Sequence, residues 1–288
     1  MIAAQFDYQV ANTLEEAVGL LAKDPDGSKV LAGGHSLIPA MKLRLAQPQV
    51  LIDIARIKSL AYIREEGDEI RIGATTTHYE IESSDLLKRI CPLLPECATS
   101  IGDVQVRNKG TIGGSLAHSD PAGDWPAAAI ALQADLVVVG SNGERVIKAD
   151  DFFVDMLTTA LKPGEILREI RIKKPEGRFA QAYQKVPHPA SGFAVVGVAL
   201  NLQLGDDGSC QAASIGITGV AAKAYRPRGV ESALAGHSLD DQTIDAAASH
   251  VCDGVDTNSD LYASDEYRCH LAKVHTRRAI RKALGRAK

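Results

Sequence analysis

Two segments of the sequence combine paired glycines with a hydroxyl side chain, and these residue types can hold a phosphate group. The first glycine motif comprises Ala32, Gly33, Gly34, His35, Ser36 and Leu37, and the second comprises Thr111, Ile112, Gly113, Gly114 and Ser115. Glycine has no Cβ and adopts positive φ readily, so backbone N–H groups beside it can close on an anion. One such segment is usually an ordinary tight turn. Two of them predict a pair of loops that hold one extended ligand, such as a diphosphate.

Other residues that could do chemistry give weaker signals. His118, Asp120 and Asp124 have the side chains of a metal site, but such spacing is common in polar loops, and we interpret them as turn caps. Asp124 also precedes a predicted helix, where it can cap the helix or accept a hydrogen bond from a ligand hydroxyl. Residues 113–117 narrowly miss the hydrolase motif G-x-S-x-G, and the Rossmann and P-loop signatures are missing. The sequence therefore predicts neither a catalytic residue nor a metal ligand in this chain.

The composition is that of an ordinary globular protein. The chain has 288 residues, of which 45% are hydrophobic and 24% charged, and its net charge of −4 argues against a nucleic-acid or membrane-surface binder. No apolar stretch reaches ~18 residues and no signal peptide is apparent, so we expect a cytoplasmic protein without membrane insertion. The five cysteines are odd in number and show no C-x-x-C. We predict reduced thiols, and any iron–sulfur cluster must then belong to a partner.

The glycine motifs require strands and helices to position them. Thr13 and Glu16 predict a capping box before a first amphipathic helix, and Thr77 and Glu80 predict another. Residues 103–124, which include the second glycine motif, are interpreted as one long polar loop. Strands are predicted at residues 29–33, 50–54, 61–64, 69–72, 135–139, 145–148 and 166–172. Further helices are predicted from residue 92 and over residues 125–132.

A boundary is predicted at residues 173–177, a charged segment with proline and glycine. Beyond it, three strands are expected at residues 179–185, 193–204 and 211–220, and helical patterns continue to the C-terminus. Lys185 ends the first of these strands, where a solvated lysine is the commoner case. Strands followed by helices indicate a small α+β unit.

Several segments resemble the FAD-binding medium subunit of the molybdenum hydroxylases, the superfamily of xanthine dehydrogenase and carbon monoxide dehydrogenase. They are residues 6–8, 31–44, 53–54 and 105–121 and the closing Tyr267-Arg268-x-x-Leu271. The resemblance covers nearly the whole chain in order. It implies an α+β protein with a vanillyl-alcohol-oxidase (PCMH) type FAD-binding fold of two subdomains, residues 1–56 and 57–175, and an α+β C-terminal domain at residues 176–288.

The resemblance also implies the function. Both glycine motifs hold the pyrophosphate and ribityl parts of one noncovalent FAD, and Ile101, Asp124, Leu167 and Lys185 match positions that line the flavin. A small subunit carries two [2Fe–2S] clusters, a large subunit carries molybdopterin, and the flavin passes their electrons to an external acceptor. The implied assembly is a dimer of heterotrimers.

Several alternatives stay open at this point. Ser115 stands where the best-known carbon monoxide dehydrogenases tend to have aspartate, so the substrate is open, and the final acceptor is NAD, a quinone or oxygen. The alternative enzyme is a stand-alone FAD-dependent oxidase or dehydrogenase of the same fold. The alternative without catalysis is a scaffold whose glycines merely form turns.

Overall fold

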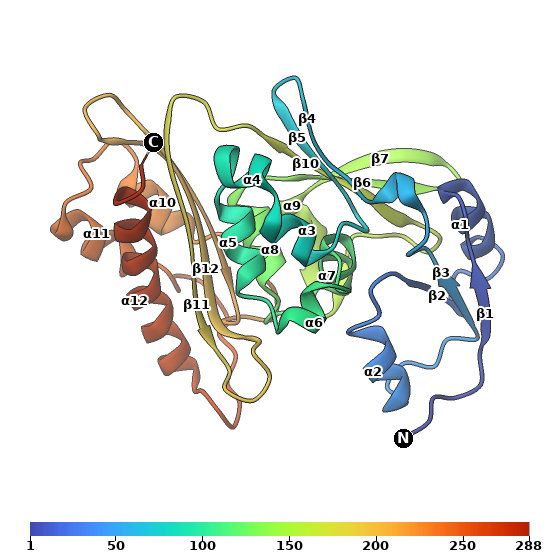
Figure 1. Ribbon diagram of the computed structural model, residues 1–288. Coiled ribbons are helices and arrows are strands. Elements are labelled where there is room, and N and C mark those ends of the chain that lie inside the picture. The colour runs from blue at the N-terminus through green and yellow to red at the C-terminus, as the bar shows by residue number, and fades with distance from the viewer. Residues whose placement is uncertain (288) are drawn as a thin grey trace.

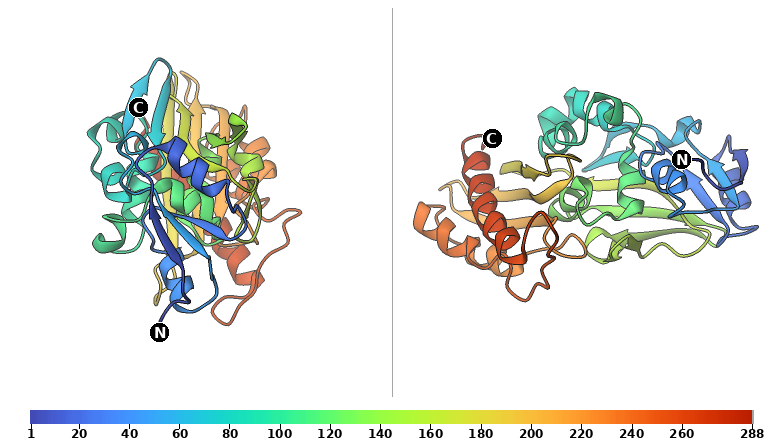
Figure 2. Two further views of the ribbon diagram at one scale, coloured as in Figure 1. Left: turned by 90° about the vertical axis from the view of Figure 1, so that its right-hand side faces the viewer. Right: turned by 90° about the horizontal axis from the view of Figure 1, so that it is seen from below.

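The structure, a computed structural model, describes residues 1–287. Its three main sheets follow one another from the N-terminal to the C-terminal end of an elongated molecule (Figure 1; Figure 2). Each sheet is built from one continuous stretch of the chain. The observed mixture of helices and strands agrees with the predicted α+β class.

The N-terminal region is a small parallel sheet with one covering helix. Its elements are β1 (Asp7–Val10), α1 (Leu14–Leu21), β2 (Ser28–Leu31), α2 (Leu37–Lys42) and β3 (Val50–Asp53), and the strand order is β1-β3-β2. Ala17, Val18 and Leu21 of α1 pack on Ile52 of the central strand. The predicted cap is only half formed, because Thr13 Oγ1 accepts from the Glu16 N–H, whereas Glu16 Oε2 accepts from the N–H of Asn12. β1 and α2 were not predicted.

The central region contains a five-stranded antiparallel sheet of order β4-β5-β10-β6-β7. Its first elements are the 3₁₀ turn η1 (Lys58–Leu60), β4 (Ile63–Glu66), β5 (Glu69–Gly73), α3 (His78–Ser83), α4 (Asp85–Ile90), α5 (Leu93–Thr99), α6 (Val104–Arg107), α7 (Ile112–His118) and α8 (Asp124–Ala131). The remainder are β6 (Asp135–Gly140), β7 (Gly143–Lys148), α9 (Ala149–Phe152), β8 (Phe153–Asp155), β9 (Thr158–Thr159) and β10 (Ile166–Lys173). Helices α5 and α8 bury their apolar residues with this sheet in one core.

The prediction of one long loop at residues 103–124 is wrong, because the segment contains α6 and α7. Asp103 caps α6 by accepting from the Val106 N–H at 2.8 Å, and Thr111 caps α7 by accepting from the Gly114 N–H at 3.1 Å. Aspartate, threonine and glycine favour both turns and helix starts. Composition alone therefore did not separate a loop from two short helices.

The C-terminal region is an antiparallel sheet covered on both faces. It comprises β11 (Arg178–Pro187), β12 (Ala194–Leu204), β13 (Cys210–Thr218), α10 (Arg228–Leu234), α11 (Asp241–Ala248) and α12 (Asp265–Leu284). Val198 packs in the core shared with α12, whereas the next residue, Ala199, packs in the core shared with α8. Gly216 lets α8 approach, since a Cβ there would lie 2.0 Å from the Ala127 carbonyl oxygen. The predicted order of strands and then helices is confirmed.

The prediction that all five cysteines are reduced is wrong for one pair. Cys252, after α11, and Cys269, in α12, form a disulfide with their Cα atoms 6.1 Å apart, and Cys91, Cys97 and Cys210 are free and buried. The packing of α12 beside the turn that follows α11 brings the pair together, and no short motif signals that packing. Among residues 1–287, no helix is long and apolar enough to cross a membrane.

Candidate functional site

The two glycine motifs lie against one another. A Cβ added at Gly33 would lie 2.1 Å from the carbonyl oxygen of Lys109 and 2.8 Å from the Cα of Gly110, directly before the second motif. Only glycine permits such a close approach of two backbones. The fold therefore brings together two loops that are far apart in the sequence, as predicted.

The first glycine motif leaves its backbone donors free. Gly34 has φ +75°, as predicted, whereas Gly33 does not adopt positive φ. The N–H groups of residues 33–37 donate to no acceptor in the described part of the chain. Ser36 is the N-cap residue of α2, but its hydroxyl makes no capping bond. The motif thus offers five successive N–H groups and a hydroxyl at a partly exposed helix start, which is a suitable environment for an anion.

The backbone N–H groups of the second glycine motif are already bonded to acceptors of this chain. The donor and acceptor pairs are Ile112 N to Thr76 O (3.0 Å), Gly113 N to Ala74 O (2.9 Å), Gly114 N to Thr111 Oγ1 (3.1 Å) and Ser115 N to Thr111 O (3.0 Å). The expectation that this motif repeats the free N–H groups of the first is therefore wrong. What it presents outward is the exposed backbone of Gly114 and the partly exposed hydroxyl of Ser115.

His78 ties the second motif to the core and was not singled out from the sequence. Its N–H donates to Gly110 O at 2.9 Å, and its Nδ1 accepts from Trp125 Nε1 at 3.0 Å. Burial, and to a smaller extent nearby His35 and Arg107, lower the pKa of His78 to about 4. The ring is therefore neutral near pH 7. The Thr77 capping box, which places residue 78 at the start of a helix, was the only available signal.

Asp124 and Lys185, both predicted to line the flavin, form a buried ion pair. Lys185 Nζ lies 2.9 Å from Asp124 Oδ2 and donates to Ser100 O at 2.9 Å, while the Tyr183 hydroxyl donates to Asp124 Oδ1 at 2.5 Å. The two side chains are 6% and 5% exposed, for Lys185 and Asp124 respectively. Burial raises the pKa of Asp124, against the opposing effects of Lys185 and Tyr183. Tyr183 was missed, although it is two residues from Lys185 on the same strand.

Three of the predicted apolar residues, Ile101, Ile112 and Leu167, belong to one core. Ile112 and Leu167 are 2% and 4% exposed, and Ile101, next to Ser100, is partly buried against the same cluster. Leu167 lies at an irregularity between β10 and β6. Little of the surface of Ile112 and Leu167 is therefore open to a ligand. Their contact with a flavin stays a prediction.

The weaker signals have structural explanations. Asp120 Oδ1 accepts from the Ala122 N–H at 2.8 Å, which is turn capping, and His118 Nε2 lies 3.9 Å from Asp120 Oδ2. Within residues 1–287, no group of three or more His, Cys, Asp or Glu side chains is arranged to hold a metal. The geometry therefore does not support the interpretation of His118, Asp120 and Asp124 as metal ligands.

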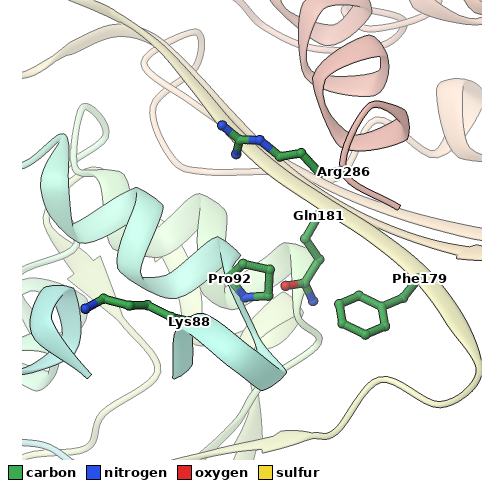
Figure 3. Close-up of a pocket in the computed structure, with 5 residues that line it drawn as sticks. All are labelled: Lys88, Pro92, Phe179, Gln181 and Arg286. Atoms are coloured by element: carbon green, nitrogen blue, oxygen red, sulfur yellow. The ribbon is translucent and has the colours of Figure 1, made fainter. Parts of the chain in front are cut away.

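A cavity of about 250 Å³ lies elsewhere, lined by Lys88, Pro92, Phe179, Gln181 and Arg286 (Figure 3). The charged ends of Lys88 and Arg286 point away from the other three side chains (Figure 3). They pair with Asp85 at 3.2 Å and Glu96 at 3.1 Å, and Gln181 accepts from the Leu93 N–H. The polar groups of this cavity are thus already satisfied.

Comparison with known proteins agrees with this architecture. Residues 4–175 match the family described as the FAD binding domain in molybdopterin dehydrogenase, and residues 181–283 match the CO dehydrogenase flavoprotein C-terminal domain. The chain is 38% identical to the carbon monoxide dehydrogenase medium chain of Hydrogenophaga pseudoflava, with 99% of each chain covered. It is 35% identical to the 6-hydroxypseudooxynicotine dehydrogenase complex subunit alpha of Paenarthrobacter nicotinovorans, with 98% of this chain and 96% of the relative covered.

Solved structures give the same result. The carbon monoxide dehydrogenase of Hydrogenophaga pseudoflava superimposes with a TM-score of 0.96 at 39% identity over 100% of both chains, and quinoline 2-oxidoreductase of Pseudomonas putida 86 with a TM-score of 0.92 at 30% identity over 99% of both. The chain belongs to the family of FAD-binding medium subunits of the molybdenum hydroxylases. Within that family it is of the carbon monoxide dehydrogenase medium-subunit type, an oxidoreductase subunit.

Proposed function

We propose that this chain is the electron-transfer flavoprotein of a multi-subunit molybdenum hydroxylase. It takes electrons from [2Fe–2S] clusters of a small subunit and passes them to an external acceptor. The observation that supports this role best is the run of free N–H groups at residues 33–37, which lies against the second glycine motif. That arrangement fits the diphosphate of FAD.

We propose distinct tasks for the two motifs in holding FAD noncovalently. The N–H groups of residues 33–37, the Ser36 hydroxyl and the neighbouring Ala32 form the diphosphate cradle. Gly114 and Ser115 form the opposite wall, where the missing side chain admits the ligand and the hydroxyl donates to it. When bound, FAD supplies a centre that accepts and releases electrons. The protein positions it, and the buried Asp124–Lys185 pair fixes the charges on the enclosed side of the site.

We divide the chain into an FAD-binding subdomain at residues 1–56, a second at residues 57–175 and a C-terminal domain at residues 176–288. The three main sheets lie within these three ranges, which supports the division. The charged segment at residues 173–177 supports the second boundary.

The partners follow from the chemistry that this chain lacks. Residues 1–287 contain no arrangement for a metal or an iron–sulfur cluster, so electrons must arrive through a protein contact. One similar structure is described as lacking the Mo-pyranopterin moiety of the molybdenum cofactor, and one relative as part of a dehydrogenase complex. We therefore propose a small iron–sulfur subunit, a large molybdopterin subunit and a cytoplasmic dimer of heterotrimers.

The substrate is selected at the molybdenum, in another chain. Relatives at 35–38% identity are named for carbon monoxide, glyceraldehyde and 6-hydroxypseudooxynicotine. Sequence identity of this chain therefore does not favour one of those substrates over the others. A stand-alone oxidase would need a free base beside the flavin. Asp124 and Lys185 are poor candidates, because each is enclosed and bonded to the other.

Purification from the native host tests the proposal. We expect co-purifying chains that carry iron and molybdenum, and a yellow supernatant after acid denaturation, because the flavin is noncovalent. A flavin-bearing monomer that contains neither metal and oxidises alcohols or aldehydes rapidly would refute the electron-transfer role. Flavin retained in the pellet would refute noncovalent binding. Stopped-flow reoxidation with NAD, a quinone and oxygen in turn identifies the acceptor.

A further inference from the structure

The Cys252–Cys269 disulfide lies in the C-terminal region, outside both glycine motifs. Cys252 lies in the turn after α11, Cys269 lies in the second turn of α12, and both are partly exposed. Disulfides are rare in the cytoplasm, and those that occur there are usually redox-sensing or catalytic. Disulfides that solvent reaches are also the ones that exchange with thiols. The bond is therefore suited to reversible reduction.

The disulfide closes residues 253–264, which we call the disulfide loop. Most of these residues are exposed, and Ala263 is the one that is buried. The Asn258 N–H donates to Val220 O at 2.7 Å, and Asp260 Oδ2 accepts from Arg268 Nη2 at 2.5 Å. A loop with so few buried contacts depends on its closure for order.

α12 has a second anchor directly beside the disulfide. Arg268 is buried, and its Nη1 donates to Val195 O at 2.8 Å and to Gly219 O at 2.6 Å. Apolar residues of α12 also pack in the core shared with β12 and β13. Cleavage of the S–S bond therefore frees the disulfide loop without detaching the helix.

The disulfide loop contacts the turn between β11 and β12. The ring centroids of Tyr262 and His188 are 4.5 Å apart, and Figure 1 shows the segment before α12 and this turn at the same end of the C-terminal sheet. The turn follows Lys185 of the buried ion pair, and after it the Ala194 N–H donates to Ala122 O at 3.1 Å, near the other member of the pair. The contact with Tyr262 thus supports a turn that is bonded into the proposed flavin site on both sides.

We infer that Cys252 and Cys269 form a thiol–disulfide exchange site that regulates how firmly the flavin is held. The inference rests on the proposed function, which places FAD beside Asp124 and Lys185, and on the proposed cytoplasmic location. A thiolate of a cytoplasmic dithiol attacks one sulfur of the pair, the S–S bond breaks, and the sulfur that leaves takes a proton. The second thiol of the reductant then breaks the mixed disulfide. In total, two electrons and two protons pass from the dithiol, which becomes a disulfide, to the two cysteines.

Reduction changes the loop first and the flavin site second. Without the cross-link the disulfide loop samples more conformations, because the bond no longer restricts the segment that it closes. The ring contact between Tyr262 and His188 is then lost, and the turn between β11 and β12 is held less firmly. FAD dissociates faster from the reduced protein than from the oxidised protein.

The first test measures exchange in the native complex. Dithiothreitol is added without denaturant, and thiols are then labelled with iodoacetamide. Cys252 and Cys269 should become labelled after reduction. The internal control for an intact fold is the set of buried thiols, which should stay unlabelled until urea is added: Cys91, Cys97 and Cys210.

Proteolysis measures whether the loop opens. Chymotrypsin should cleave after the exposed Leu261 or Tyr262 at least about tenfold faster in the reduced complex. The Cys252→Ser/Cys269→Ser variant should be cleaved at this higher rate with and without dithiothreitol. That variant is the control that separates loss of the bond from other effects of the reductant.

The rate of FAD release, followed by flavin fluorescence after dilution, tests the regulation. Release should be several-fold faster after reduction and in the Cys252→Ser/Cys269→Ser variant. Tyr262→Ala should reach a similar rate in the oxidised protein, because it removes the contact with His188. The matched control is Tyr267→Ala, which alters a tyrosine of α12 that is 48% exposed, against 47% for Tyr262, and should leave the rate unchanged.

The possible failures can be told apart. Reduction by dithiothreitol only after urea has unfolded the chain would overturn the exchange site. Equal rates of FAD release from the oxidised and reduced complexes would overturn the regulation and leave the proposed function intact. A complex that contains no FAD in either state would instead refute the proposed function, while thiol labelling would still show the exchange.

Discussion

The two glycine motifs share a sequence pattern but differ in how their backbone donors are used. In the first, the N–H groups of residues 33–37 are free, and the hydroxyl of the cap residue Ser36 makes no capping bond. In the second, the N–H groups of residues 112–115 are all satisfied, and the cap residue Thr111 is bonded. The first motif is available to a ligand, and the second is mainly a structural wall against which the first is held.

This difference arises from the neighbours of each motif. The second motif runs beside residues 74–78, whose carbonyl groups accept from it, and Thr77 and Thr111 form an isolated bridge. The first motif leaves β2 and passes into α2, which lies apart from the sheets (Figure 1). A glycine pair therefore predicts a close approach of backbones, and only the surrounding fold decides whether a ligand or another strand occupies that space.

The largest effect is expected where the motifs meet. Gly33→Ala places a Cβ 2.1 Å from the Lys109 carbonyl oxygen, so the two loops must separate, with an expected cost of about 3 kcal/mol in unfolding free energy. FAD binding should fall with it. Gly19→Ala is the matched control, because a Cβ there meets nothing within 4 Å and alanine favours the helix. Urea unfolding should show a lower unfolding free energy for Gly33→Ala and a slightly higher one for Gly19→Ala. Equal stability of the two variants would show that the motifs do not need to meet at Gly33.

His78 provides a pH test of the second motif's attachment. The folded-state pKa of His78 is lowered to about 4 from 6.5, so the unfolded chain binds a proton first as the pH falls. The stability present above pH 6.5 is therefore lost between pH 6.5 and 4, by up to about 3 kcal/mol. His78→Asn keeps an acceptor for Trp125 and cannot titrate. Its urea midpoint should vary less between pH 7 and 5 than that of the unaltered chain. An identical pH dependence of the two midpoints would contradict the proposed role of the buried, neutral His78.

Much of the fold could be predicted from local patterns. The Thr77–Glu80 capping box and the hairpin joined at Asn142-Gly143 were read correctly, because their signals lie within a few residues. β1 is short and mostly exposed, so it lacks an apolar pattern. α2 was missed because it begins after glycines and contains Pro39, which a helix tolerates in its first turn.

The site was only partly predictable for a different reason. The residue types of both motifs indicated close backbone approach, and the ion pair of Asp124 and Lys185 joins two residues singled out separately. The acceptors Ala74 and Thr76, the buried His78 and the Cys252–Cys269 disulfide depend on packing between distant segments. No local signal carries that information.

A smaller effect should distinguish the two cap residues. Thr111→Ala removes the acceptor of the Gly114 N–H and should lower the unfolding free energy by about 1 kcal/mol. The freed N–H then resembles those of the first motif. Thermal unfolding at pH 7.5 measures the loss, and Thr111→Ser, which retains the hydroxyl, is the control that should recover most of it. An unchanged melting temperature in Thr111→Ala would show that this cap is not needed.

Ser36→Ala should have the smallest effect on stability, because the Ser36 hydroxyl makes no capping bond. We expect a change within about 0.5 kcal/mol, typical of a surface position without special contacts. FAD titration should nevertheless show weaker binding, since the hydroxyl belongs to the proposed cradle. Ser83→Ala, at the C-terminal end of α3, is an exposed serine control that should leave flavin affinity unchanged. If Ser36→Ala lowered stability as much as Thr111→Ala and left FAD affinity unchanged, both motifs would be structural and the distinction between them would fail.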